Sequence, residues 1–108
     1  MITLRNEADL RWIMNKSESF IVSFYTDWCG PCMYVNKALK QWSKENSCIQ
    51  VAKVDIDECE PIRQYFAVEN LPSLVFIKDG EIEDRFEGGN CNRLKKLIED
   101  FFAIRLKD

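Results

Sequence analysis

A run of apolar residues that ends in two cysteines decides the fold: residues Phe20–Cys32 read FIVSFYTDWCGPC. Its first six residues, Phe20–Tyr25, are almost continuously apolar, which is typical of a central β-strand buried on both faces. After the cysteines, apolar residues recur with the spacing of one helix face, which predicts a helix from about Cys32 to Glu45. The residues of this stripe are Val35, Ala38, Leu39 and Trp42.

Similar patterns predict a strand or a helix in most of the remaining chain. Asn6 is expected to cap a helix that ends near Lys16, and Asn90 is expected to cap the last helix. Asp79-Gly80 is a typical two-residue turn of a β-hairpin. The other expected elements are strands at Ile2–Leu4, Ile49–Ile56, Ser73–Lys78 and Glu81–Glu87, and a short helix after Pro61.

The expected elements follow one another in the order β-α-β-α-β-α-β-β-α. Strands separated by helices are expected to be parallel, with right-handed crossovers, whereas the final hairpin adds an antiparallel pair. The predicted fold class is therefore α/β, with a central mixed β-sheet and helices on both faces. Because the chain has 108 residues and no repeat or linker, we expect a single domain over residues 1–108.

The composition argues against several classes of function. Fifteen Lys and Arg residues against 18 Asp and Glu give a net charge of −3 without a basic stripe, so we expect no nucleic-acid partner. The apolar runs are too short for a membrane span and the first residues do not resemble a signal peptide, so we expect no membrane partner and a cytoplasmic location. The absence of histidine excludes Cys-His and Ser-His pairs.

The Cys29-x-x-Cys32 pair is the strongest candidate for chemistry. Cys29 precedes a helix N-terminus, where unpaired backbone N–H groups and the helix dipole favour the thiolate, the reactive form of cysteine. Cys32 is expected in the first turn of that helix, where it can come within disulfide distance of Cys29. Pro31 suits a first helical turn, and Gly30 relieves crowding where a substrate approaches.

A metal site is the main alternative for such a pair. A zinc or iron–sulfur site would need a second closely spaced pair, but Cys48, Cys59 and Cys91 are scattered singly. A Cys-x-x-Cys at a strand–helix junction instead favours redox chemistry, so we expect no bound metal. Cys48 adjoins a strand and is expected to be a small buried apolar residue, whereas Cys91 lies at a helix N-terminus.

These features resemble the thioredoxin family, and the resemblance extends in order along nearly the whole chain. Five segments carry it: Trp28–Cys32 (WCGPC) as the active site, Val51–Asp57 (VAKVDID) as the third strand, Leu71–Ser73 (LPS) as the cis-proline loop, Lys78–Glu81 (KDGE) as the hairpin and Phe86–Asn90 (FEGGN) as the turn before the last helix. The resemblance implies a thioredoxin fold and a protein-disulfide reductase.

In that family the chemistry is dithiol–disulfide exchange. The resemblance implies that Cys29 is the nucleophile that forms a mixed disulfide with a target protein, and that Cys32 is the resolving thiol. The pair would end as a redox-active Cys29–Cys32 disulfide, with Trp28 packed beside it.

The resemblance also implies how a substrate is bound. Pro72, expected in cis, would lie opposite the thiols, and the backbone of Leu71 would pair with an extended substrate segment. Gly88 or Gly89 would let the substrate backbone approach closely, and Trp28 would line the same surface.

A source of electrons and a set of partners follow from the same resemblance. An NADPH-dependent thioredoxin reductase would re-reduce the protein, which would itself bind no cofactor. The substrates would be disulfide-containing proteins, with peroxiredoxin and ribonucleotide reductase as candidates, and the protein would be a monomer.

Two alternatives stay open. One is a disulfide oxidase or isomerase, although the Gly-Pro dipeptide between the cysteines resembles that of reductases. The other is a partner-binding module that uses an apolar rim of Trp28, Met33, Leu71 and Pro72.

Three residues depart from the family pattern, and a fourth, Lys53, keeps it without its usual partner. Ser23 stands where thioredoxins typically carry a buried Asp that exchanges a proton with the resolving cysteine, and Lys53 matches the lysine that partners this Asp. We expect Ser23 to shuttle the proton with a water, and Lys53 to extend outward or to favour the Cys32 thiolate by its charge. Met33 replaces a lysine, and Lys37 replaces a proline that commonly kinks the helix.

Overall fold

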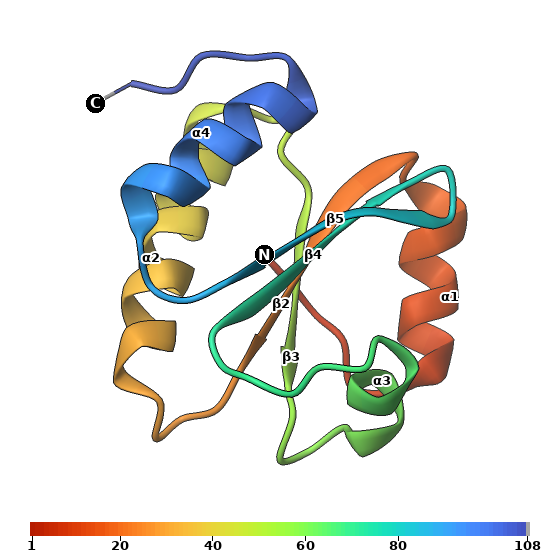
Figure 1. Ribbon diagram of the computed structural model, residues 1–108. Helices are drawn as coiled ribbons and strands as arrows, with labels where there is room; N and C mark the ends of the chain where they lie inside the picture. Colours follow the sequence, from red (N-terminus) through yellow and green to blue (C-terminus); the bar gives the residue numbers. More distant parts are fainter. Residues whose placement is uncertain (108) are drawn as a thin grey trace.

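Residues 1–107, which a computed structural model of the chain describes, form helices and strands in the expected order (Figure 1). The helices are α1 (Glu7–Lys16), α2 (Gly30–Glu45), α3 (Glu60–Tyr65) and α4 (Cys91–Phe102). The strands are β1 (Ile2–Thr3), β2 (Ser19–Tyr25), β3 (Val51–Asp55), β4 (Ser73–Lys78) and β5 (Glu81–Glu87). The predicted α/β class is confirmed.

Several element ends confirm or refine the predictions. Asn6 and Asn90 cap α1 and α4, each accepting a backbone N–H group with its side chain. The start of α2 lies two residues earlier than predicted, at Gly30, because Cys29 itself is the N-cap. The helix then continues without a break through Lys37.

The sheet is mixed and has the strand order β1-β3-β2-β4-β5. β3 runs parallel to β1 and β2, whereas β4 runs antiparallel to β2 and β5. The register places Ser23 of β2 between Lys53 of β3 and Leu74 of β4. β2 is therefore the middle strand, as its apolar sequence predicts.

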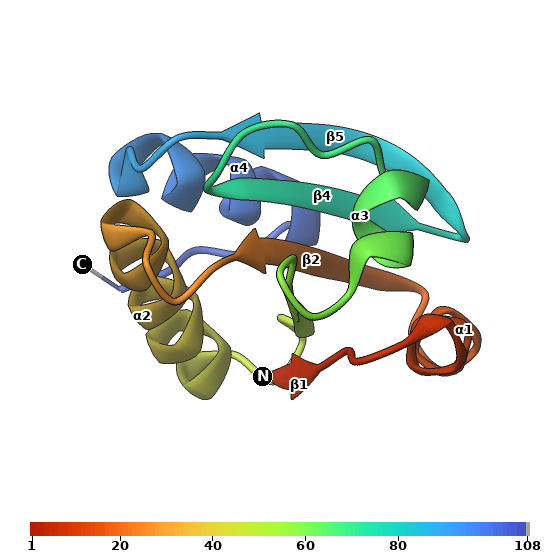
Figure 2. The same ribbon diagram turned by 90° about the horizontal axis from the view of Figure 1, so that it is seen from below.

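Helices cover both faces of this sheet, with α1 and α3 on one side and α2 and α4 on the other (Figures 1 and 2). The side chains of β2 alternate between the two faces: Phe20, Val22 and Phe24 join the core under α1 and α3, whereas Ile21 joins the core under α2 and α4. Ser23 follows Ile21 on the α2 face and is 1% exposed. A buried hydroxyl therefore lies where α2 begins.

The hairpin that ends the sheet turns at Asp79-Gly80, as predicted. Both residues have positive φ angles, of 52° and 80°, which is the backbone conformation that tight hairpins favour. β5 is the outer strand, and all its side chains except Phe86 are exposed. Its charged residues are Glu81, Glu83, Asp84, Arg85 and Glu87. Within residues 1–107, no helix is both long and apolar enough to cross a membrane.

Leu39→Ala should destabilise the protein by about 2–5 kcal/mol, because Leu39 is fully buried between α2 and the sheet and its truncation leaves a cavity. Urea unfolding followed by circular dichroism measures this change. Lys40→Ala is the matched control, since Lys40 is exposed on the same helix and its loss should cost less than about 0.5 kcal/mol. Equal effects of the two substitutions would contradict the packing of α2.

Candidate active site

A disulfide joins Cys29 and Cys32 at the N-terminus of α2, with 5.3 Å between the two Cα atoms. Cys29 is the N-cap of the helix, and its Sγ accepts a hydrogen bond of 3.3 Å from the backbone N–H of Cys32. A donor and the positive end of a helix dipole therefore face the sulfur of Cys29 and favour a negative charge there. Cys29 is 8% exposed and Cys32 only 1%, so an incoming group meets Cys29 first.

The loop before β4 and the turn before α4 complete the surroundings of the disulfide. The Leu71–Pro72 peptide bond is cis, as expected, and Pro72 is buried. The backbone N–H of Gly88 donates to the carbonyl oxygen of Pro72 at 3.0 Å, which ties the two segments together. A Cβ atom placed on Gly89 would lie 3.4 Å from Cβ of Pro31, so this turn adjoins the Cys-x-x-Cys segment.

Of the three glycines around the disulfide, Gly30, Gly88 and Gly89, only Gly88 has a backbone conformation that requires glycine. Gly88 has a φ of 101°, a conformation that other residues rarely adopt. Gly30 instead faces open space, since a Cβ atom added there would meet no atom within 4 Å. The side of the disulfide next to Gly30 is therefore unobstructed.

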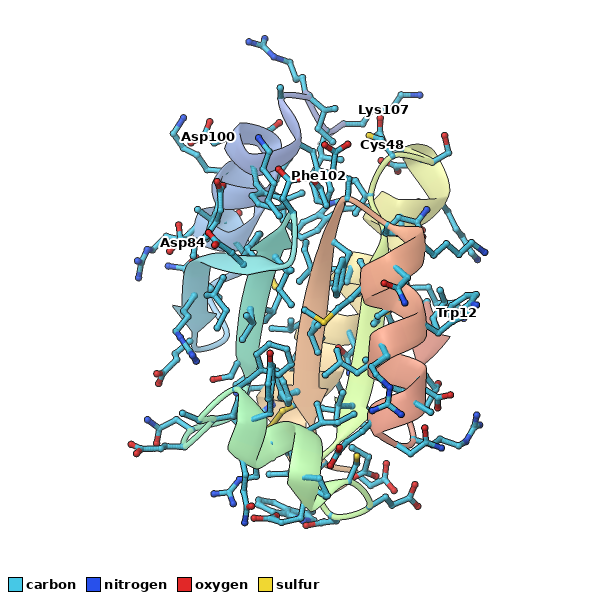
Figure 3. The ribbon with its side chains drawn as sticks, turned by 90° about the vertical axis from the view of Figure 1, so that its right-hand side faces the viewer. Trp12, Cys48, Asp84, Asp100, Phe102 and Lys107 are labelled. Carbon is cyan, nitrogen blue, oxygen red and sulfur yellow. A yellow bond between two sulfur atoms is a disulfide. The ribbon has the colours of Figure 1, made fainter. Side chains whose placement is uncertain are left out.

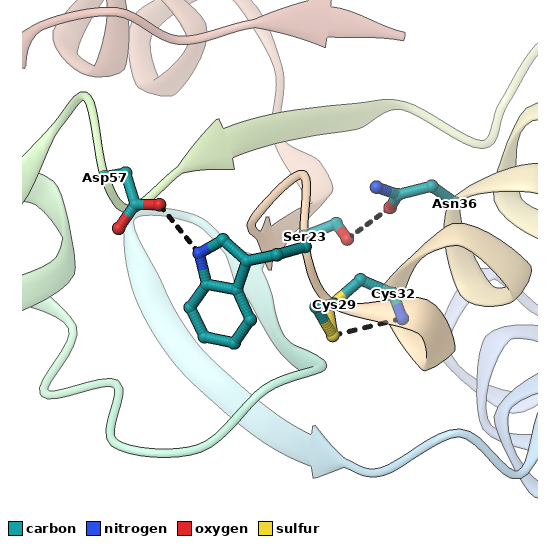
Figure 4. The surroundings of a disulfide bond; sticks show 6 residues. Ser23, Cys29, Cys32, Asn36 and Asp57 are labelled. Atoms are coloured by element: carbon teal, nitrogen blue, oxygen red, sulfur yellow. Dashed lines mark hydrogen bonds between the residues drawn. A yellow bond between two sulfur atoms is a disulfide. The ribbon is translucent and has the colours of Figure 1, made fainter.

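Trp28 lies on the surface beside the disulfide. Its side chain is 75% exposed, and its indole Nε1–H donates to Asp57 Oδ2 at 3.0 Å (Figure 4). The hydrogen bond fixes the orientation of a large aromatic ring that, because it is exposed to solvent, could otherwise rotate. Met33 and Tyr34, in the first turns of α2, are also exposed, by 66% and 73%. Large exposed side chains thus directly precede and directly follow the Cys-x-x-Cys segment.

Beneath the disulfide, Ser23 has a partner that the sequence did not reveal. The Ser23 hydroxyl donates to Asn36 Oδ1 at 2.8 Å, and Figure 4 shows the two side chains directed toward each other. Asn36 follows Cys32 by four residues and so lies on the same face of α2. The four-residue spacing from Cys32 was the sequence feature that could have pointed to Asn36. The apolar stripe of the helix gives no indication that Asn36 bonds to Ser23.

Lys53 and Tyr25 interact next to this pair. Lys53 is half-buried, and its Nζ lies 5.7 Å from the ring centroid of Tyr25. Burial raises the pKa of the Tyr25 phenol above its usual value, and the nearby carboxylates of Asp55 and Asp27 raise it further. Tyr25 is therefore neutral at physiological pH, and Lys53 contacts an uncharged aromatic ring.

The three remaining cysteines differ in their exposure to solvent. Cys48 is exposed, so the expectation that it is buried is wrong: β3 begins only at Val51, and Cys48 lies in the turn after α2. Figure 3 shows it at the end of the molecule that carries Lys107. Cys59 is the buried thiol, and Cys91 is half-buried. Within residues 1–107, no group of three or more cysteine or acidic side chains is placed to hold a metal ion.

A mixed α/β sheet with a Cys-x-x-Cys disulfide at a helix N-terminus, next to a cis-proline loop, defines a class of dithiol–disulfide proteins. The family model described as Thioredoxin matches residues 2–100, and the chain belongs to the thioredoxin family. This confirms the family that the sequence motifs indicated.

Individual relatives agree with this assignment. The chain is 37% identical to Thioredoxin-T of Drosophila melanogaster over 104 residues, 94% of this chain and 66% of that protein. It spans just over half the length of two further curated relatives, 56% and 55%. The X-ray structure of Fasciola hepatica thioredoxin superposes with a TM-score of 0.88 at 35% identity, covering 94% of this chain and 99% of that one. A structure concerned with yeast mitochondrial 1-Cys peroxiredoxin and the glutathione/thioredoxin systems superposes with a TM-score of 0.85 at 27% identity, covering 93% and 94%.

Asn36→Ala should destabilise the protein by about 1–3 kcal/mol, because the buried Ser23 hydroxyl loses its acceptor. Adding Ser23→Ala removes the stranded donor, so the double variant should be less destabilised than the sum of the two single variants. A double-mutant cycle from urea unfolding should give a coupling energy of about 1 kcal/mol. Strictly additive effects would mean that the pair does not interact in solution.

Proposed function

We infer that this protein is a protein-disulfide reductase that works by dithiol–disulfide exchange. The observation that carries this proposal is the Cys29 sulfur at the N-cap of α2, which is bonded to Cys32 and belongs to the more exposed of the two residues, at 8% against 1%. Membership of the thioredoxin family supports the same activity.

In the first step the reduced protein attacks its target. The Cys29 thiolate, favoured by the helix N-terminus and the Cys32 N–H group, bonds to one sulfur of the target disulfide. The other target sulfur leaves as a thiolate and takes up a proton. Cys29 is the nucleophile because it is the more exposed of the two thiols.

In the second step Cys32 resolves the mixed disulfide. The Cys32 thiol gives up its proton, and its sulfur attacks Sγ of Cys29 and displaces the second target thiolate. Two electrons have then passed to the target, which is reduced, and the protein holds the Cys29–Cys32 disulfide seen in the structure. Re-reduction of that disulfide completes the cycle.

Residues around the disulfide would receive the target chain. The backbone of Leu71, next to cis-Pro72, would pair with an extended substrate segment, and the turn at Gly88 and Gly89 would leave room for its approach. Trp28 supplies an oriented aromatic surface on the other side. Pro31 and the open side of Gly30 support this arrangement by shaping the Cys-x-x-Cys turn.

The proposed electron source is NADPH, through a thioredoxin reductase that reduces the Cys29–Cys32 disulfide. The candidate targets are disulfide-containing proteins, among them peroxiredoxin and ribonucleotide reductase. The peroxiredoxin candidate is supported by the structural relative that concerns a yeast mitochondrial 1-Cys peroxiredoxin and the glutathione/thioredoxin systems. A monomer in the cytoplasm fits this role, because a reducing compartment keeps the dithiol available.

The exposed rim of Trp28 and Met33 is the observation that favours a second function, a module that binds partners without turnover. The two functions differ in what the thiols do. A binding module keeps its partners in a Cys29→Ser, Cys32→Ser double variant, whereas a reductase loses its function in that variant.

Cys29→Ser should abolish the reduction of insulin disulfides in the presence of NADPH and a thioredoxin reductase, because the nucleophile is lost. Cys32→Ser should instead trap a mixed disulfide with the target, since the second step has no attacking thiol. Turbidity of the reduced insulin chains measures the first effect, and mass spectrometry of the trapped adduct measures the second.

Cys48→Ser is the control for both variants, because α2 separates the exposed Cys48 from the disulfide by about 24 Å. It should retain the wild-type rate. Failure of the fully reduced wild-type protein to reduce insulin would defeat the proposed function. A redox potential as oxidising as that of disulfide isomerases, measured against glutathione, would favour the oxidase or isomerase alternative.

A further inference from the structure

Thr26, the residue after β2, carries a hydroxyl that the mechanism has not used. The side chain is 1% exposed, and its Oγ1 atom is buried without a hydrogen-bond partner. A buried hydroxyl left unpaired is costly, and in proteins such groups are usually satisfied by an ordered water. Thr26 is therefore a candidate ligand for water.

Thr26 is also one of the residues that line a cavity of about 270 Å³. The lining of this cavity comes from the end of β2, the following loop and the first turns of α2: Tyr25, Thr26, Asp27, Cys32, Met33 and Asn36. A water molecule needs about 30 Å³ of liquid volume, so the cavity has room for several. Because Asp27 and Met33 are exposed, the cavity communicates with bulk solvent.

Cys32 is another lining residue, although only 1% of its surface is exposed. Asn36 lines the cavity as well, and its Oδ1 already accepts the Ser23 hydroxyl (Figure 4). This hydrogen bond fixes the orientation of the amide and leaves its nitrogen as a donor. Three residues with polar side chains, Thr26, Asn36 and Cys32, thus lie around one small solvent-connected cavity.

We propose that Thr26 Oγ1 and the Asn36 amide hold a water molecule against Cys32, and that this water carries the proton of the Cys32 thiol to and from solvent. Ser23 acts through Asn36 as a positioning residue. The proposal rests on the reductase function proposed above and identifies the path by which its second step exchanges a proton.

The step balances without any further reactant. During target reduction, the Cys32 proton passes to the held water and from there to bulk water, while the Cys32 sulfur forms a bond to Sγ of Cys29. The bond between Cys29 and the target sulfur breaks, and the released thiolate takes a proton from solvent. During re-reduction the same water returns a proton to Cys32.

The charged and titratable groups around the cavity leave a water as the carrier. A phenol is already neutral near pH 7, and burial raises the pKa of Tyr25 further, so Tyr25 does not accept the proton. Lys53, on β3, places its Nζ over the Tyr25 ring and is not among the residues that line the cavity. Asp27, at the cavity rim, is the one other group that a test must exclude.

The two steps can be timed separately with dithiobis(nitrobenzoate), an aromatic disulfide that releases one coloured thiolate at each step. The fully reduced protein is mixed with this reagent in a stopped-flow instrument. The first phase reports attack by Cys29, and the second reports attack by Cys32 on the mixed disulfide. Rates are recorded between about pH 5 and about pH 9, the range over which thiol ionisation changes.

Thr26→Val is the central variant, because it has nearly the same shape and lacks the hydroxyl. It should slow the second phase about ten-fold near neutral pH, the usual effect of removing a hydrogen bond to a charged group, and leave the first phase unchanged. Thr26→Ser keeps a hydroxyl and should retain most of the second-phase rate. Asn36→Leu removes the other water ligand and should slow the second phase as Thr26→Val does.

Asp27→Asn should not slow the second phase, because the water rather than this carboxylate accepts the proton. An equal loss in Thr26→Val and Thr26→Ser, no loss in Thr26→Val and Asn36→Leu, or a loss in Asp27→Asn would each overturn the proposal. If Thr26→Val does not unfold cooperatively in urea, Asn36→Leu decides the outcome. A wild-type protein that shows no second phase would instead contradict the reductase function itself.

Discussion

The hydrogen bond from the Cys32 N–H group to the Cys29 sulfur is the interaction on which the site depends. It forms because α2 begins at Gly30, with only four residues between it and the end of β2, a strand whose side chains are buried on both faces of the sheet. The apolar side chains of β2 fix that strand at the centre of the sheet, and the strand in turn fixes the start of the helix. Packing energy, distributed over two cores, thereby holds one sulfur atom at the positive end of a helix.

The remaining parts of the site are positioned by strand pairing rather than by local sequence. The antiparallel register of β2 and β4 sets Phe24 beside Ser73, which places Pro72 at the same end of the sheet as the cysteines. The backbone bond between Gly88 and Pro72 then carries the turn before α4 to that end. Segments far apart in the chain thus meet because their strands are neighbours.

Much of the fold and the chemical centre could be predicted from the sequence, because both depend on short-range signals. The apolar run of β2, the capping residues Asn6 and Asn90, and the Asp79-Gly80 turn have local physical causes. The hydrogen bond of Ser23 could not be predicted in this way, since it depends on how α2 packs over the sheet. The exposure of Cys48 was misjudged for a related reason: neighbouring a strand in sequence does not place a residue inside the sheet.

The outer strand β5 leaves one edge of the sheet with backbone groups that another strand could join. Along this edge the chain places four carboxylates, at Glu81, Glu83, Asp84 and Glu87, and a single guanidinium, at Arg85. Two copies of the protein that approached edge to edge would bring like charges together and would have to desolvate them. The fold therefore resists the edge-to-edge growth that leads to fibrils, and it does so at the boundary farthest from the parallel half of the sheet.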